Sequence, residues 1–119
     1  MRLDHVQIAG PPGCEQEARR FYGDLLGLEE IAKPEPMRAS GGVWFKVGER
    51  ELHIGIEDPF APARKAHPAL SVGAAELDDL AGRLADAGAS VDWDERYPGV
   101  RRFYTADPFG NRLEILCDS

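Results

Sequence analysis

The chain has little cysteine, a deficit of positive charge and no long apolar run, and each shortage excludes a class of protein. Cys14 and Cys117 are the only cysteines among 119 residues and form no CxxC pair, so we expect two free thiols. Fourteen lysines and arginines against 21 acidic residues give a net charge of -7, which argues against nucleic-acid binding. Because no segment approaches the roughly 20 apolar residues of a membrane span, we expect a cytoplasmic protein without a membrane partner.

The same order of elements can be read twice along the chain. Each half begins with an alternating strand, continues with a helix that has one apolar face and a glycine stop, and ends with three strands. In the first half the strands fall at residues 3–9, near Ile31, 43–47 and 51–57, with the helix at 15–27. In the second half they fall at residues 67–72, 91–93, 100–105 and 112–117, with the helix at 75–87.

This repeat predicts the fold class. Two βαβββ modules make an α+β protein whose mixed sheets curve around a cleft, with each helix on the apolar face of a sheet. A length of 119 residues fits one domain over residues 1–119. We expect module one at about 1–57, a linker with two prolines at about 58–65, and module two at about 66–119.

The three histidines of the chain occupy end strands of this repeat. Positions 5 and 53 are 48 apart, and positions 67 and 114 are 47 apart, which pairs His5 with His53 and His67 with Glu114. Each of the four side chains lies on the strand face opposite to the more apolar one. Three imidazoles and one carboxylate suit a divalent metal such as Zn, Ni, Co, Fe or Mn. A lone strand histidine is usually structural, so the prediction depends on the repetition.

Aromatic and basic side chains in the middle strands are candidates for a substrate pocket. Small-molecule pockets usually have apolar walls with a few polar groups. The candidates are Trp44, Phe45, Arg101, Arg102, Phe103 and Tyr104. Arg101 and Arg102 are consecutive on one strand and point to opposite faces, so one of them could meet an anionic substrate group.

Four segments resemble the vicinal oxygen chelate superfamily, which contains glyoxalase I, bleomycin-resistance proteins, fosfomycin-resistance transferases and extradiol dioxygenases. They are LDHVQIAG, ARRFYGDLLGLEE, KAHPALSV and DPFGNRLEIL, and the resemblance spans nearly the whole chain. It implies that His5, His67 and Glu114 are metal ligands and that the protein is a homodimer. His53 stands where glyoxalase I has a glutamate, so the paired carboxylates of that enzyme are missing.

Three functions remain open from the sequence. The first is a metal-dependent lyase, isomerase or dioxygenase acting on a small oxygen-bearing substrate, with Glu114 or His53 as the general base. The second is a non-enzymatic drug-binding protein of the bleomycin-resistance type. The third is a structural or regulatory domain that kept its histidines by ancestry.

Overall fold

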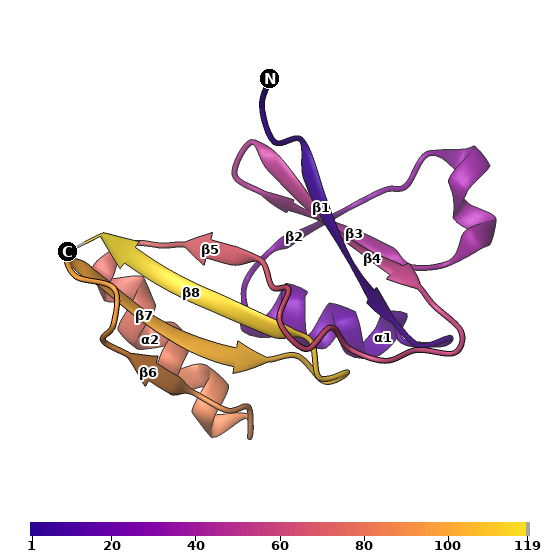
Figure 1. Ribbon diagram of the computed structural model, residues 1–119. Helices are drawn as coiled ribbons and strands as arrows, with labels where there is room; N and C mark the ends of the chain where they lie inside the picture. The colour runs from indigo at the N-terminus through magenta and orange to yellow at the C-terminus, as the bar shows by residue number, and fades with distance from the viewer. Residues whose placement is uncertain (119) are drawn as a thin grey trace. The chain divides into compact units, whose positions relative to one another are not determined.

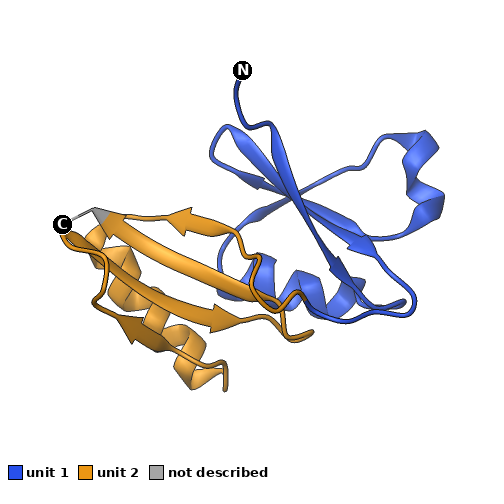
Figure 2. Ribbon diagram, viewed as in Figure 1, with its two compact units in different colours: residues 1–62 blue, residues 63–119 orange. Residues whose placement is uncertain are grey.

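The computed structural model describes residues 1–118, which form two compact units (Figure 1). Unit 1 comprises residues 1–62, and unit 2 begins at Ala63 (Figure 2). The boundary falls inside the segment that the sequence predicts as a linker. No helix within residues 1–118 has the length and apolar composition that crossing a bilayer requires.

Unit 1 contains one four-stranded mixed sheet in the order β1-β4-β3-β2. Its elements are β1 (His5–Gly10), α1 (Glu15–Ala18), η1 (Arg19–Leu25), β2 (Glu29–Ile31), η2 (Glu35–Ser40), β3 (Val43–Val47) and β4 (Arg50–Ile56). Strand β1 pairs parallel with β4, and the other neighbours are antiparallel. A parallel pair needs a crossover connection, and the first helix together with β2 and β3 supplies it.

The helix of unit 1 packs its apolar side against the sheet and widens in its second half. The rings of Tyr22 and Phe45, both fully buried, lie 5.7 Å apart. In the π-helical segment η1 the amide of Leu26 donates to the carbonyl of Phe21, five residues earlier. This wider turn shifts the apolar face by one position, so Leu26 is buried and Leu25 is half-buried, whereas α-helical spacing predicts that Leu25 is buried.

Two glycines shape the strands around His53. Gly48 has φ +58° and begins the two-residue turn between β3 and β4, a position that favours glycine in hairpins. Gly42 has φ +89°, and a Cβ there would lie 2.3 Å from the carbonyl oxygen of Ile54. Because glycine has no side chain, the backbone at position 42 can approach β4 closely, and β3 begins directly beside it.

Unit 2 repeats the arrangement with the strand order β5-β8-β7-β6. Its elements are β5 (Ala69–Ser71), α2 (Ala74–Asp86), β6 (Asp92–Asp94), β7 (Val100–Ala106) and β8 (Arg112–Asp118). Strand β5 is parallel to β8, as β1 is to β4. Helix α2 packs on β8 with Leu77, Leu80 and Leu84 buried, and it ends before Gly88, which has φ +88°.

The expected α+β fold of two βαβββ modules is therefore confirmed, with differences at element ends. The 3-10 segment η2 was not expected, and it fills the stretch that Pro34 and Pro36 keep out of a strand. The predicted strand 67–72 is shorter, so His67 lies two residues before β5 rather than within it. Pro68 explains this, because it lacks the amide hydrogen that a strand pairing at this position would use.

Candidate functional site

His67 and Glu114 face each other within unit 2. The Nε2 atom of His67 lies 3.2 Å from Oε1 of Glu114, and their side chains are 24% and 8% exposed. Nδ1 of His67 lies 2.9 Å from the carbonyl oxygen of Lys65, which can only accept, so Nδ1 carries the hydrogen. In a neutral ring Nε2 then presents its lone pair to the carboxylate.

Backbone contacts hold this pair in place. The amide of Glu114 donates to the carbonyl of Pro68 at 3.0 Å, which ties the segment carrying His67 to β8. The turn before β8 is fixed by Asp107, whose Oδ1 accepts the amides of Phe109 and Asn111, each at 2.9 Å. These contacts set the register of β8 and hence the direction of the Glu114 side chain.

The His67–Glu114 pair fits a metal ion chemically. Two facing lone pairs on Nε2 and Oε1 require a positive charge between them, which a proton or a metal cation supplies. Two ligand atoms about 2.1 Å from one ion and about 90 to 110° apart lie about 3.0 to 3.4 Å from each other. The observed 3.2 Å falls within that interval. The bond from Nδ1 to a backbone carbonyl is also the usual orienting contact of a metal-binding histidine.

A chain of charged groups continues from the second oxygen of Glu114. Arg102 donates from Nη1 to Oε2 of Glu114 at 3.1 Å and from Nη2 to Oδ1 of Asp94 at 3.2 Å. The hydrogen bond from the Arg96 side chain, with weaker help from the Arg96 amide and Arg102, holds the pKa of Asp94 well below its ordinary value. The two oxygens of Glu114 thus have different partners: Oε1 faces His67, and Oε2 is bound by the Arg102 guanidinium.

Three stacked rings mark the corresponding face of unit 1. His53 lies between Trp44, at a centroid distance of 3.7 Å, and His5, at 4.3 Å. The Nε2 atom of His53 is 2.9 Å from Oε1 of Glu51, and Nδ1 of His5 is 2.9 Å from Oδ2 of Asp4. His53 is buried, with both ring faces covered, so its orientation is fixed.

The structure thus brings the four predicted ligands together in pairs, His5 with His53 in unit 1 and His67 with Glu114 in unit 2. Among residues 1–118 no group of three or more histidine, cysteine, aspartate or glutamate side chains is placed to hold one metal ion.

The predicted pocket residues divide between the two faces of each sheet. Phe45 and Phe103 are fully buried core residues. Trp44 lies on the histidine face of unit 1, because it pairs across strands with His53. Tyr104 pairs with Glu114 in the same way, and its ring centroid lies 5.4 Å from that of His67 with the two rings nearly perpendicular.

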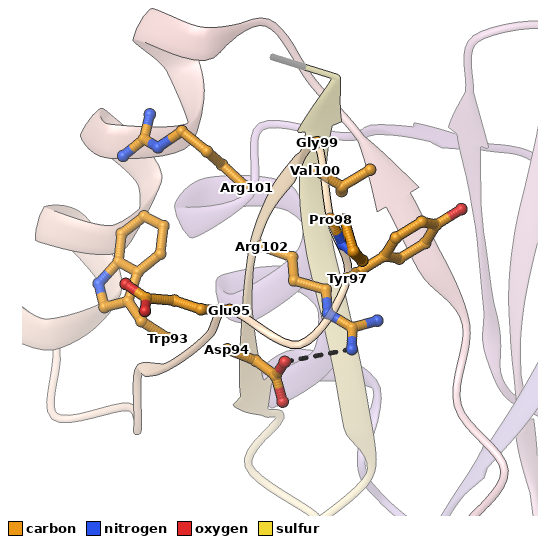
Figure 3. A pocket seen from close by; sticks show the side chains of 9 residues that line it. All are labelled: Trp93, Asp94, Glu95, Tyr97, Pro98, Gly99, Val100, Arg101 and Arg102. Carbon is orange, nitrogen blue, oxygen red and sulfur yellow. Dashed lines mark hydrogen bonds and ion pairs between the residues drawn. The ribbon is translucent and has the colours of Figure 1, made fainter.

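The two consecutive arginines have different partners. Arg101 binds Asp78 of helix α2, with Nη2 2.8 Å from Oδ1, whereas Arg102 lies on the Glu114 face. Figure 3 shows their guanidinium groups directed away from each other. Arg102 is therefore the arginine that belongs to the Glu114 face.

A cavity of about 390 Å³ lies at the β6–β7 connection in unit 2. Its wall includes the half-exposed rings of Trp93 and Tyr97 and the Arg102–Asp94 ion pair, which is drawn as a dashed line (Figure 3). Arg102 also lies under the Tyr97 ring, 5.3 Å from its centroid. This cavity offers an aromatic wall and acidic groups beside a half-buried guanidinium.

The sequence did not identify three partners of the site residues, which are Glu51, Asp94 and the Lys65 carbonyl. Glu51 could have been found, because it shares the strand face of His53 two residues away. Asp94 could have been found only from the pairing of β6 with β7, which places it opposite Arg102. A backbone carbonyl carries no sequence signal.

Comparison with known proteins identifies the family. No match was found among curated proteins. A protein from Bacillus anthracis described as a glyoxalase family member is 49% identical over 100% of this chain and 96% of that one, with a TM-score of 0.94. The fosfomycin resistance protein FosX from Listeria monocytogenes is 18% identical (100% and 94% covered, TM-score 0.80). Lactoylglutathione lyase from Agrobacterium tumefaciens is 24% identical (94% and 91% covered, TM-score 0.69). The model of the Glyoxalase/Bleomycin resistance protein/Dioxygenase superfamily matches residues 2–115, so the chain belongs to that superfamily.

Proposed function

We propose that the protein is a divalent-metal-dependent enzyme that acts on a small oxygen-bearing substrate. The observation that carries the proposal is the His67–Glu114 pair, whose Nε2 and Oε1 atoms lie 3.2 Å apart on a shielded sheet face. His67 and Glu114 would hold the metal, and His5 and His53 stay predicted as further ligands. A bound metal of this kind acts as a Lewis acid toward substrate oxygens.

The residues around the pair have separate roles in this proposal. The Lys65 carbonyl holds the His67 ring so that Nε2 remains an acceptor. Arg102 holds Oε2 of Glu114, so Oε1 is the oxygen that would bind the metal or, once detached from it, take up a proton. Arg102 also offsets the charge of Glu114, which favours an anionic oxygen on the substrate as the partner of the metal.

The proposed reaction is of the lyase, isomerase or dioxygenase type, and the names of proteins with similar folds support this range. Lactoylglutathione lyase and a fosfomycin resistance protein share this fold. His53 stands where glyoxalase I has a glutamate, and Glu114 or His53 is the first candidate for the general base. We also propose that the protein works as a cytoplasmic homodimer, as members of the superfamily often do.

A reconstitution assay tests the enzymatic proposal. Purified protein is stripped with chelator, reloaded separately with Zn, Ni, Co, Fe and Mn, and assayed with hemithioacetals, with fosfomycin plus a thiol, and with catechols. We expect turnover that disappears with chelator and returns with one metal. Turnover that survives complete metal removal would contradict the proposal. Light scattering on the same samples measures the mass expected for two chains.

A drug-binding function is the second candidate. The cavity at the β6–β7 connection supports it, because Trp93 and Tyr97 give it an aromatic wall that suits an aromatic drug. Titration with cationic aromatic drugs in the presence of chelator separates the two functions, since a pure binder retains its affinity without metal.

A further inference from the structure

A second cavity, of about 250 Å³, lies in unit 1 beside the stacked rings. Gln7 and Trp44 line it, and both are cross-strand neighbours of His53, one on each side. The cavity therefore opens on the histidine face of the sheet. Its volume is below the roughly 300–1,000 Å³ of most ligand pockets, so it suits a small molecule or one end of a larger one.

Lys33 brings a positive charge to this cavity. Ile31 pairs with Trp44 across β2 and β3, and Lys33 follows two residues later. Its Nζ donates to the Ser40 hydroxyl at 3.4 Å and to the Gly41 carbonyl. Both acceptors are uncharged, so neither contact is an ion pair.

Glu15 is an acidic side chain that interacts electrostatically with Lys33, and its carboxylate is already engaged. Its Oε2 accepts the amide of Gly42 at 2.8 Å. That hydrogen bond, followed by one from the Glu15 amide and weaker effects of Arg19 and Lys33, lowers the pKa of Glu15. Glu15 thus stabilises the glycine turn, and no ion pair within residues 1–118 joins it to Lys33.

Gln7 adds a hydrogen-bonding group, and its position depends on Gly55. A Cβ at residue 55 would lie 2.6 Å from Nε2 of Gln7, so the absent side chain makes room for the amide. Trp44 and the half-exposed Met37 add apolar walls. An ammonium group, an amide and an apolar wall together form the lining expected for a small organic anion.

We propose that this cavity binds the anionic group of a small organic acid, either a carboxylate or a phosphonate, with Lys33 as its counter-ion and Gln7 as a hydrogen-bond donor. The proposal extends the proposed function by naming the substrate class, since Trp44 places the cavity beside the predicted ligand His53. The binding step itself needs no metal.

Titration of chelator-treated protein tests it. In a Trp93→Phe background Trp44 is the only tryptophan, so its indole N–H resonance reports on the cavity. The probes are butyrate, propylphosphonate and uncharged butanol. We expect both anions, or one of them, to shift the Trp44 resonance in a saturable and salt-sensitive way, with butanol at least about tenfold weaker. The stronger anion identifies the acidic group.

Variants decide whether Lys33 carries the charge. Lys33→Gln should weaken anion binding about tenfold or more, Lys33→Arg should retain most of it, and Lys46→Gln, outside the cavity, should not change it. Gly55→Ala should weaken it by displacing the Gln7 amide. Equal binding of butanol and the anions, or unchanged binding by a folded Lys33→Gln protein, would overturn the proposal. Because chelator is present throughout, that failure is distinct from failure of the metal site.

Discussion

The Nε2 atom of His67 lies 3.2 Å from Oε1 of Glu114, while the guanidinium of Arg102 engages the other oxygen of the same carboxylate. The first contact pairs two atoms that are acceptors when the ring is neutral, and the second is an ordinary ion pair. This asymmetry leaves one oxygen available for a cation and fixes the carboxylate through the other.

Arg102 should matter more for stability than its neighbour Arg101. Arg102→Gln leaves the buried Glu114 and the half-buried Asp94 without their shared cation. Arg101→Gln breaks an exposed ion pair with Asp78 and an exposed contact with the Trp93 ring, each of which contributes little. Urea unfolding of the two variants should show a clearly lower midpoint for Arg102→Gln and a small change for Arg101→Gln. Equal midpoints would show that the Arg102 network does not stabilise unit 2.

The two glycines around β3 provide a second matched pair. Gly48→Ala should cost about 1 kcal/mol of unfolding free energy, because only its left-handed conformation is unfavourable and no atom lies within 4 Å of the new Cβ. Gly42→Ala should cost about 1–3 kcal/mol more, because its Cβ meets the Ile54 carbonyl. Denaturant titration measures both values, and similar losses would contradict the close approach at Gly42.

Acid should destabilise the wild type more steeply than a Glu15→Gln variant. The Gly42 amide lowers the pKa of Glu15 below its ordinary value of 4.5, so the folded state favours the ionised form. That contribution is fully present above about pH 4.5 and is lost as the pH falls through the lowered pKa. Thermal midpoints from pH 7 to pH 3 measure the difference, with Glu17→Gln as the control. Parallel curves for wild type and Glu15→Gln would refute the role of this hydrogen bond.

The metal affinity of alanine variants tests whether His5 and His53 are ligands. If both are ligands, His5→Ala and His53→Ala should each weaken Zn²⁺ binding by about tenfold or more, as expected when a ligand is removed. Trp44→Phe, which keeps an aromatic ring on His53, should leave the affinity nearly unchanged. Calorimetric titration measures all three variants. Unchanged affinity in His53→Ala would assign His53 to the Glu51-bound structural role alone.

The repeat made most of the fold predictable from the sequence. Alternation, helical spacing and glycine stops are local signals. Because each of them occurs at equivalent positions in both modules, one copy supports the interpretation of the other. The exceptions have local physical causes that periodicity does not carry. The π-helical turn moved burial from Leu25 to Leu26, and Pro68 kept His67 out of β5.

The candidate site was less predictable than the fold. The pairing of His67 with Glu114 followed from equivalent positions in the repeat. The partners that orient them did not, because the Lys65 carbonyl is a backbone group and Asp94 reaches Arg102 only through strand pairing. Lys33 lies in a connection without periodicity, so its place beside Trp44 required coordinates.

The metal content of two unit 2 variants tests the central claim most directly. His67→Ala, Glu114→Gln, the exposed control Asp86→Asn and the wild type are loaded with Zn²⁺, dialysed and measured by elemental analysis, with folding checked by circular dichroism. The account predicts about one ion per chain in the wild type and in Asp86→Asn, and little metal in the other two. Full occupancy in folded His67→Ala and Glu114→Gln proteins, or none in the wild type under any loading condition, would contradict it.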